Sequence, residues 1–254
     1  MQSLFYRNVQ IEEISVPGYL LMNMESDFEL GEGAKILGRG GTAHTIKSRL
    51  KNPELISKHG VIDVAIKIIR GSEEEAEHRE EVKRAFRYEV AILGSLPSSP
   101  FVVKFLGFTE DPVMSIIMKF YPFCLTGLLK NKDFVTEPPL ILKIGHDIAS
   151  GMKVLHENGI LHLDLKPRKK LVAGSLSLYH LPVIANILVD IEADWSIRCV
   201  ICDFGYANFI GTERPTVRGI EKPESIGITW RYASPQVKMM EDPIFDILYN
   251  CGLD

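Results

Sequence analysis

A single lysine inside an apolar run is the sequence feature that most constrains the fold of this chain. Lys67 interrupts the run VAIKII, whose β-branched residues favour a buried strand. The segment 72–93 repeats apolar residues at the spacing of one helical face, and Glu89 lies beside that face. We therefore predict an ion pair between Lys67 and Glu89, which joins a helix to a sheet and turns the amine toward a polyanion. The alternative is that Lys67 extends its amine to solvent and Glu89 lies at the helix edge.

Short apolar runs separated by turns predict a small β-sheet in the first half of the chain. These runs cover residues 34–41, 61–69, 101–108 and 113–121. After residue 121, apolar residues recur at helical spacing from Leu140 to Leu155, and this helix should end near Asn158 and Gly159. The segments 186–191 and 197–204 follow as a strand pair. We expect an α+β chain of two lobes, residues 28–121 and 122–254, with residues 1–27 as an N-terminal extension.

The charge pattern argues against several classes of partner. The chain has 29 Lys and Arg against 33 Asp and Glu, a net charge of -4, and the basic residues are spread along it. Nucleic acid and an acidic membrane surface both require a basic face, so we expect neither as a partner. The most apolar stretches are broken by polar residues, and the first residues do not form a signal peptide. We expect an intracellular, cytoplasmic protein, and nothing in the sequence indicates a particular oligomeric state.

Two cysteines superficially resemble a metal-binding or redox pair. Cys199 and Cys202 have the CxxC spacing, but they lie in the apolar run IRCVICDF and no second pair accompanies them. We predict a buried strand in which these cysteines act as small hydrophobic residues.

Three further groups of residues suggest phosphate chemistry. The segment from Leu37 to Thr45, LGRGGTAHT, places glycines where backbone amides could approach phosphate oxygens, although glycines also form ordinary hairpin turns. In the loop HLDLKP, Asp164 could accept a hydroxyl proton, and Lys166 could neutralise a phosphoryl group in transfer. Asn186, and Asp203 in the sequence DFG, could bind a hard cation such as Mg²⁺. Taken singly, each of these residues is more often a solvated loop or capping residue.

In chain order, the glycine loop, VAIK, the helix glutamate, HLDLKP, Asn186 and DFG resemble the motifs of the eukaryotic protein kinases over about residues 28–254. The resemblance implies a bilobal fold. Its N-lobe would be a small antiparallel β-sheet with one helix (residues 28–121, including the hinge), and its C-lobe, residues 122–254, would be mainly helical. It also implies ATP and Mg²⁺ as cofactors and a protein as substrate.

The family's roles transfer residue by residue to this sequence. Asp164 would be the catalytic base, assisted by Lys166, while Lys67, held by Glu89, would contact the phosphates. Asn186 and Asp203 would hold Mg²⁺. Met118 would guard the back of the adenine pocket, Lys119 to Tyr121 would form the hinge, and Ala65 and Thr45 would cover the base. The complete set of expected nucleotide contacts is Leu37, Gly38, Gly40, Ala43, Thr45, Ala65, Lys67, Met118, Lys119 and Tyr121.

The expected activity is transfer of the γ-phosphoryl group of ATP to serine or threonine hydroxyls of a protein. Lys166 in DLKP and Thr229 in GITWRYASP are more similar to serine/threonine kinases than to tyrosine kinases. The alternative is an inactive pseudokinase or truncated product that at most binds nucleotide or a protein partner.

The sequence departs from the family pattern in four places. Leu163 replaces the arginine of HRD, which argues against switching by a phosphorylated activation loop. Asp164 and Asn186 are 22 positions apart instead of five, so residues 168–184 form an insertion of 17 residues, which we expect to displace Asn186 from Asp164. We hypothesise that this segment is a translated intron. Ser234-Pro235-Gln236 replaces Ala-Pro-Glu. The chain ends at the start of the expected central helix, so we expect an incomplete C-lobe.

Overall fold

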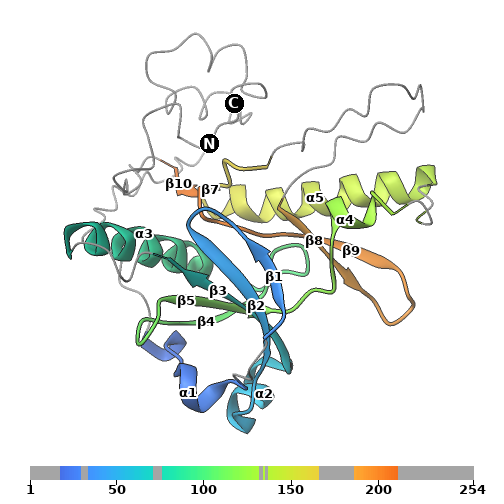
Figure 1. The fold of residues 1–254 in the computed structure, drawn as a ribbon. Helices are drawn as coiled ribbons and strands as arrows, with labels where there is room; N and C mark the ends of the chain where they lie inside the picture. Colours follow the sequence, from blue (N-terminus) through green and yellow to red (C-terminus); the bar gives the residue numbers. More distant parts are fainter. Residues whose placement is uncertain are drawn as a thin grey trace.

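The two-lobed α+β architecture predicted from the sequence is confirmed (Figure 1). The computed structural model describes residues 18–29, 34–70, 76–131, 134, 137–165 and 186–210. The N-lobe contains a five-stranded antiparallel sheet in the order β1-β2-β3-β5-β4. Its strands are β1 (Ile36–Arg39), β2 (Ala43–Arg49), β3 (Asp63–Ile69), β4 (Phe105–Thr109) and β5 (Ser115–Lys119). Four of them match the predicted apolar runs, and β2 is the more polar strand that follows the glycine loop.

Each face of the N-lobe sheet has its own apolar core. Side chains alternate between the faces along β3, so Ile66 and Lys67 point in opposite directions. Helix α3 (Ala76–Ser95) packs on the inner face, where Phe86 and Val90 join a cluster that continues into the C-lobe. The outer face buries Ile66 in a second cluster with residues of the N-terminal segment and of the β2–β3 connection.

Part of the predicted N-terminal extension, residues 18–27, lies on the outer face of the sheet. Residues 18–27 pack on the sheet through the 3-10 helix η2 (Gly18–Leu20) and helix α1 (Met24–Asp27). Leu21 pairs with Phe108 in parallel orientation, and Met22 and Met24 are buried. These methionines cover apolar surface that the sheet would otherwise expose to water.

A short helix in the N-lobe was also not predicted. Helix α2 (Pro53–His59) lies between β2 and β3, so the N-lobe has helices other than α3. Asn52 accepts a hydrogen bond from the Glu54 N–H at its start, Pro53 occupies the first turn, and Gly60 ends it with φ of 65°. In Figure 1, α1 and α2 lie at the end of the sheet away from the C-lobe helix α5.

The described part of the C-lobe is built on helix α5 (Pro138–Glu157), which ends at Asn158 and Gly159 as predicted. Gly151 lets this helix approach the C-lobe sheet closely, since a Cβ at this position would lie 2.8 Å from the Ile201 side chain of that sheet and 2.7 Å from the Phe101 backbone oxygen. The remaining elements are α4 (Leu125–Leu128), β6 (Phe123–Cys124), β7 (Ile160–Leu161), β8 (Ile187–Ile191), β9 (Ile197–Ile201) and β10 (Asn208–Phe209). Strands β6, β8 and β9 form one sheet, and β7 pairs with β10.

Several predictions fall on residues outside the described ranges. These are the insertion 168–184, the position of Lys166, the segment with Thr229 and Ser234-Pro235-Gln236, and the end of the chain. Among the described residues, no helix is both long and apolar enough to span a membrane.

Candidate active site

The predicted ion pair between Lys67 and Glu89 is present, and a third residue joins it. The Lys67 Nζ lies 2.7 Å from Glu89 Oε1 and 2.9 Å from Asp203 Oδ1. Lys67 comes from β3, Glu89 from α3, and Asp203 from the segment that follows β9, so the cluster joins the two lobes. The Lys67 and Glu89 side chains are only 15% and 8% exposed, which excludes the alternative of a lysine extended into solvent.

The cluster keeps its charges although it is partly buried. Burial alone disfavours the ammonium, but attraction to Glu89 and Asp203 outweighs this cost and raises the pKa of Lys67. Burial likewise disfavours the Asp203 carboxylate, but the charge and hydrogen bond of Lys67 lower the pKa of Asp203 below its ordinary value. Both groups are therefore ionised at neutral pH, and Lys67 presents a fixed positive charge between the lobes.

Gly205 lies against the charged cluster, where a side chain would crowd it. A Cβ added to Gly205 would lie 3.2 Å from Asp203 Oδ1 and 3.5 Å from the Lys67 Nζ. The Asp203 backbone is left-handed, with φ of 64°, a conformation that aspartate tolerates better than most residues. The close approach of the DFG turn to the lysine thus depends on a residue without a side chain.

The strand register gathers the expected nucleotide contacts on the inner face of the sheet. Thr45 lies opposite both Gly38 and Lys67, and directly paired residues of antiparallel strands point to the same face. Ala65, two residues before Lys67, pairs with Met118 on the same face. The structure therefore brings these predicted residues together above the Lys67 cluster.

The glycine loop connects β1 and β2 by a tight turn in which the Gly40 N–H donates to the Ala43 oxygen at 2.8 Å. Leu37 and Gly38 belong to β1, and Ala43 is the buried first residue of β2. A Cβ on Gly38 would meet no atom within 4 Å, and one on Gly40 would make only an ordinary contact. The fold of the described residues does not itself require glycine at either position.

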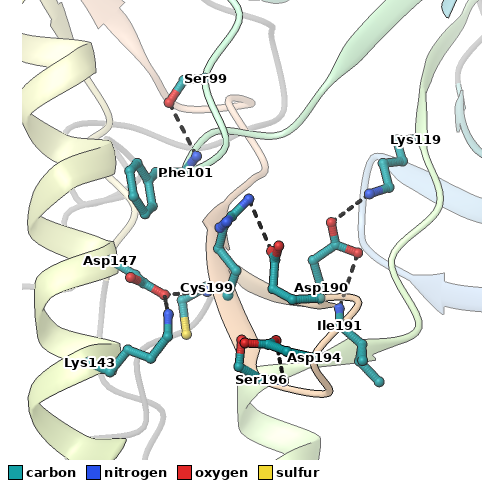
Figure 2. Close-up of polar contacts among 12 residues, drawn as sticks. Ser99, Phe101, Lys119, Lys143, Asp147, Asp190, Ile191, Asp194, Ser196 and Cys199 are labelled. Carbon is teal, nitrogen blue, oxygen red and sulfur yellow. Dashed lines mark hydrogen bonds and ion pairs between the residues drawn. The ribbon is translucent and has the colours of Figure 1, made fainter. Parts of the chain in front are cut away.

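The expected hinge follows β5, and its side chains are held by the protein. The Lys119 ammonium lies 2.5 Å from Asp190 Oδ2 of β8, which links the hinge to the C-lobe (Figure 2). The Tyr121 hydroxyl accepts a hydrogen bond from the Lys104 N–H at 3.1 Å, and burial raises the pKa of this phenol to about 12. Within the described residues, the Tyr121 backbone N–H has no hydrogen-bond partner in the protein.

Asn186 reaches Asp164 in spite of the insertion. The Asn186 Nδ2 donates to Asp164 Oδ2 at 2.7 Å and to the Asp164 backbone oxygen at 3.0 Å, across 22 positions. This corrects our expectation that the insertion displaces Asn186 from the site. The pairing of β8 with β9 explains the contact between Asn186 and Asp164. Where this pairing begins, the Cys202 N–H donates to the Asn186 backbone oxygen at 2.9 Å, so Asn186 lies beside the residue that precedes Asp203.

His162 connects the loop of Asp164 to the segment of Asp203. Its Nε2 lies 3.0 Å from the Cys202 oxygen, and the Asp164 N–H donates to its Nδ1 at 3.3 Å. Because a carbonyl oxygen can only accept, the proton belongs on Nε2 and the ring is neutral. Burial lowers the pKa of His162 below its ordinary value, even though Asp203 and Asp164 act in the opposite direction. The sequence motif places a histidine here but gives no sign of these two partners.

A buried carboxylate supports the strand that leads to Asp203. Asp147 of α5 accepts hydrogen bonds from the Cys199 N–H at 3.0 Å and from the Lys143 Nζ at 2.9 Å (Figure 2). Cys199 is buried in β9, which confirms our interpretation of the cysteine run as a core strand. No cluster of three or more His, Cys, Asp and Glu side chains that could hold a metal ion occurs among the described residues.

Asn186 and Asp203 carry oxygen atoms of the kind that bind divalent cations. Carboxylate and amide oxygens are the hard ligands that Mg²⁺ prefers, and this ion usually takes only one or two protein ligands and completes its shell with water and phosphate oxygens. Three contacts, Lys67 with Asp203, Asn186 with Asp164, and the Cys202 N–H with the Asn186 oxygen, thus bring a fixed lysine, two residues with such oxygens and an oriented aspartate together. Such a fold and site define an enzyme class that transfers phosphoryl groups from a nucleotide.

Comparison with known proteins agrees with this class. The family model of the protein tyrosine and serine/threonine kinases matches residues 32–235, and the chain belongs to this family. It contains a protein kinase domain.

Curated relatives carry kinase names. A protein of Acanthamoeba polyphaga mimivirus named as a serine/threonine-protein kinase/receptor is 27% identical over 90% of this chain and 12% of its own length. A protein of Dictyostelium discoideum named as a serine/threonine-protein kinase is 34% identical over 52% of this chain and 10% of its own length. The serine/threonine/tyrosine-protein kinase HT1 of Arabidopsis thaliana is 30% identical over 43% of this chain and 28% of its length. The chain thus spans a minor part of each of these relatives.

Proposed function

We propose that this chain is an active protein kinase that uses Mg²⁺ and ATP to phosphorylate serine and threonine hydroxyls of a protein substrate. The observation that carries the proposal is the convergence of Lys67, Asp203 and the Asp164–Asn186 pair between two lobes. These residues come from four separated segments of the chain. A purely structural ion pair would not require the oriented aspartate beside it.

The residues have distinct roles in this proposal. The ammonium of Lys67, fixed by Glu89, binds phosphate oxygens of ATP and balances their charge. Asp164 accepts the proton of the attacking hydroxyl, and the Asn186 amide orients its carboxylate. Bound Mg²⁺ would be held by Asn186 and Asp203 and would neutralise phosphate charge. Lys166 is proposed to act beside Asp164.

The adenine is proposed to lie under Thr45 and Ala65, with Met118 behind it. The Tyr121 N–H is an available donor for a ring nitrogen of the base, because no described residue accepts from it. Gly38 and Gly40 are proposed to lie over the phosphates. The open space above Gly38 supports this role, since a side chain there would obstruct a ligand and not the protein.

The test is phosphate transfer by the full chain from labelled Mg-ATP to mixed Ser, Thr and Tyr peptides. Loss of a general base costs about 10²–10⁴ in rate, so Asp164→Asn should reduce turnover by about a hundredfold or more while ATP still binds. The Mg-ATP dissociation constant is measured in parallel by calorimetry. ATP binding without Asp164-dependent turnover would instead establish the pseudokinase alternative, and phosphate on tyrosine would contradict the proposed specificity.

A further inference from the structure

A buried tyrosine beside Glu89 connects helix α3 to the segment that follows DFG. Tyr88 is 1% exposed, and its hydroxyl hydrogen-bonds to Oδ1 of Asn208. The same hydroxyl accepts from the Phe209 N–H at 3.3 Å, and the two rings meet edge to face with centroids 5.9 Å apart. The proposed chemistry above uses none of these three residues.

The partners of Tyr88 belong to a strand that is tied to both catalytic segments. Asn208 and Phe209 form β10, which pairs with β7 in the register Asn208 to Leu161. His162 follows Leu161 directly and begins the loop of Asp164. At its other end, the chain from Asp203 to β10 is short and is closed by a turn in which the Ala207 N–H donates to the Phe204 oxygen at 2.9 Å. A side chain that contacts β10 therefore contacts a strand connected to both the Asp164 loop and the Asp203 segment.

The position of Tyr88 on α3 makes this contact relevant to Glu89. The helix is 20 residues long and attaches to the sheet through apolar packing, which is nondirectional, and through the half-exposed Arg87, whose guanidinium donates to the Glu110 carboxylate at 2.8 and 2.9 Å. A hydrogen bond to a buried hydroxyl is directional and fixes rotation about the helix axis. Since Tyr88 immediately precedes Glu89, any rotation that breaks the Tyr88–Asn208 bond also moves the Glu89 carboxylate relative to Lys67.

We propose that Tyr88 is a positioning residue that holds Glu89 on Lys67 by anchoring α3 to Asn208 of β10. The proposal rests on the function proposed above, because the ion pair matters for catalysis only if Lys67 binds phosphate. In this proposal Tyr88 acts through Glu89 and not on a reacting group. The simpler alternative is that Tyr88 only fills the core and satisfies its hydroxyl, and the two roles differ in what happens at Lys67.

The test compares Tyr88→Phe and Asn208→Ala in the full chain, alone and combined. The first change removes the hydroxyl and keeps the ring, and the second removes its partner from the other side. Thr109→Val is the matched control, because Thr109 of β4 is fully buried and its hydroxyl donates to the Val113 oxygen at 2.7 Å and not to a residue of the Lys67 cluster. Any general loss of stability from deleting a buried hydroxyl appears in all three variants.

The main readout is acetylation of the Lys67 amine by acetic anhydride without nucleotide, followed by peptide mass spectrometry as a function of pH. The exposed Lys130 serves as the internal reference. Only the deprotonated amine reacts, so loss of Glu89 from Lys67 should speed the reaction about tenfold at a fixed pH, as for a pKa shift of about one unit. kcat should fall about tenfold with little change in the KM for ATP, since a misplacement of about 1 Å can cost up to about a hundredfold.

The outcomes separate this proposal from the proposed function. The combined variant should have no larger effect than the stronger single variant, because both remove the same bond. Tyr88→Phe and Asn208→Ala variants that are destabilised like Thr109→Val, with Lys67 acetylation and kcat unchanged, would overturn the positioning role. Failure of Mg-ATP to protect Lys67 in the unaltered chain would instead refute nucleotide binding, whatever the two variants do.

Discussion

The side-chain amide of Asn186 lies 2.7 Å from the Asp164 carboxylate, although the two residues are 22 positions apart. Asn186 immediately precedes β8, and its backbone oxygen accepts from the N–H of Cys202, the residue that follows β9. The strand pair, and not the length of the connecting segment, therefore brings the two side chains together. Because the strand pair holds Asn186 beside Asp164, we infer that this contact does not depend on the length of the segment between the two residues.

Removal of residues 168–184 should therefore keep the site and stabilise the chain. The deletion shortens the connection between Asp164 and Asn186 from 22 positions to five, and each halving of a flexible loop is worth about 0.6 kcal/mol. We expect a free energy of unfolding about 1 kcal/mol higher in urea denaturation, with Asp164-dependent turnover retained. A Gly-Ser replacement of equal length is the control and should match the original stability. A deletion variant that no longer folds would show that the segment itself supports the lobe.

Gly205→Ala should weaken the charged cluster without unfolding the chain. The new methyl group would lie 3.2 Å from Asp203 Oδ1, so the carboxylate must move away from Lys67. We expect Mg-ATP to bind about tenfold more weakly, equivalent to about 1.4 kcal/mol, in calorimetry. Gly145→Ala is the control, because a Cβ there meets no atom within 4 Å and alanine favours the helix by up to about 1 kcal/mol. Equal affinity in both variants would refute this dependence.

His162 should make the chain less stable as the pH falls below about 6.5. Burial lowers the pKa of His162 in the folded state, so the unfolded chain binds more protons in this window and stability is lost on acidification. His59, whose pKa is also lowered by burial, acts in the same direction. The loss is at most about 1.4 kcal/mol per pH unit for each histidine.

The readout for His162 is the slope of unfolding free energy against pH between 7.5 and 5.5, in steps of about half a unit. His162→Phe should reduce the slope even if it lowers stability at every pH, because the ring no longer titrates. His146→Gln, which removes an exposed ring on α5, is the comparison for loss of an imidazole outside the Asp164 loop. An undiminished slope in His162→Phe would mean that other groups dominate.

Local patterns in the sequence were sufficient for the Lys67–Glu89 pair. A charge inside an apolar strand and a carboxylate beside a helical stripe each favour a buried partner, and this local argument predicted that the two pair with each other. The same reasoning located α5, because its apolar residues and the stop at Asn158 and Gly159 are local signals. The signals for the Lys67–Glu89 pair and for α5 each lie within a segment of about twenty residues.

Contacts that depend on strand pairing could not be predicted in this way. The Asn186–Asp164 contact requires the β8–β9 register, and spacing along the chain indicated the opposite result. The hydrogen bonds of Tyr88 with β10 join residues 120 positions apart, and the closeness of Gly205 to Lys67 appears only when the lobes are assembled. Residues 18–27 lacked periodicity because they dock by a few buried side chains and not by a regular helical or strand face.

The docking of residues 18–27 gives a further prediction, at Gly107. A Cβ at this position of β4 would lie 2.4 Å from the Leu20 backbone oxygen, so the N-terminal segment must move if Gly107 becomes alanine. The movement would break the bond from the Met22 N–H to the Phe108 oxygen and uncover the outer core of the sheet. We expect Gly107→Ala to lose about 1–3 kcal/mol in urea denaturation, in the range of overpacked core positions.

Limited proteolysis distinguishes displacement of this segment from a general loss of stability. Gly107→Ala should be cleaved within residues 18–28 before the rest of the domain unfolds, because local opening exposes only the displaced segment. Gly18→Ala is the matched control, since its Cβ would meet nothing within 4 Å and should change neither stability nor cleavage. Protection of the segment in Gly107→Ala would instead show that β4 adjusts and that residues 18–27 stay docked.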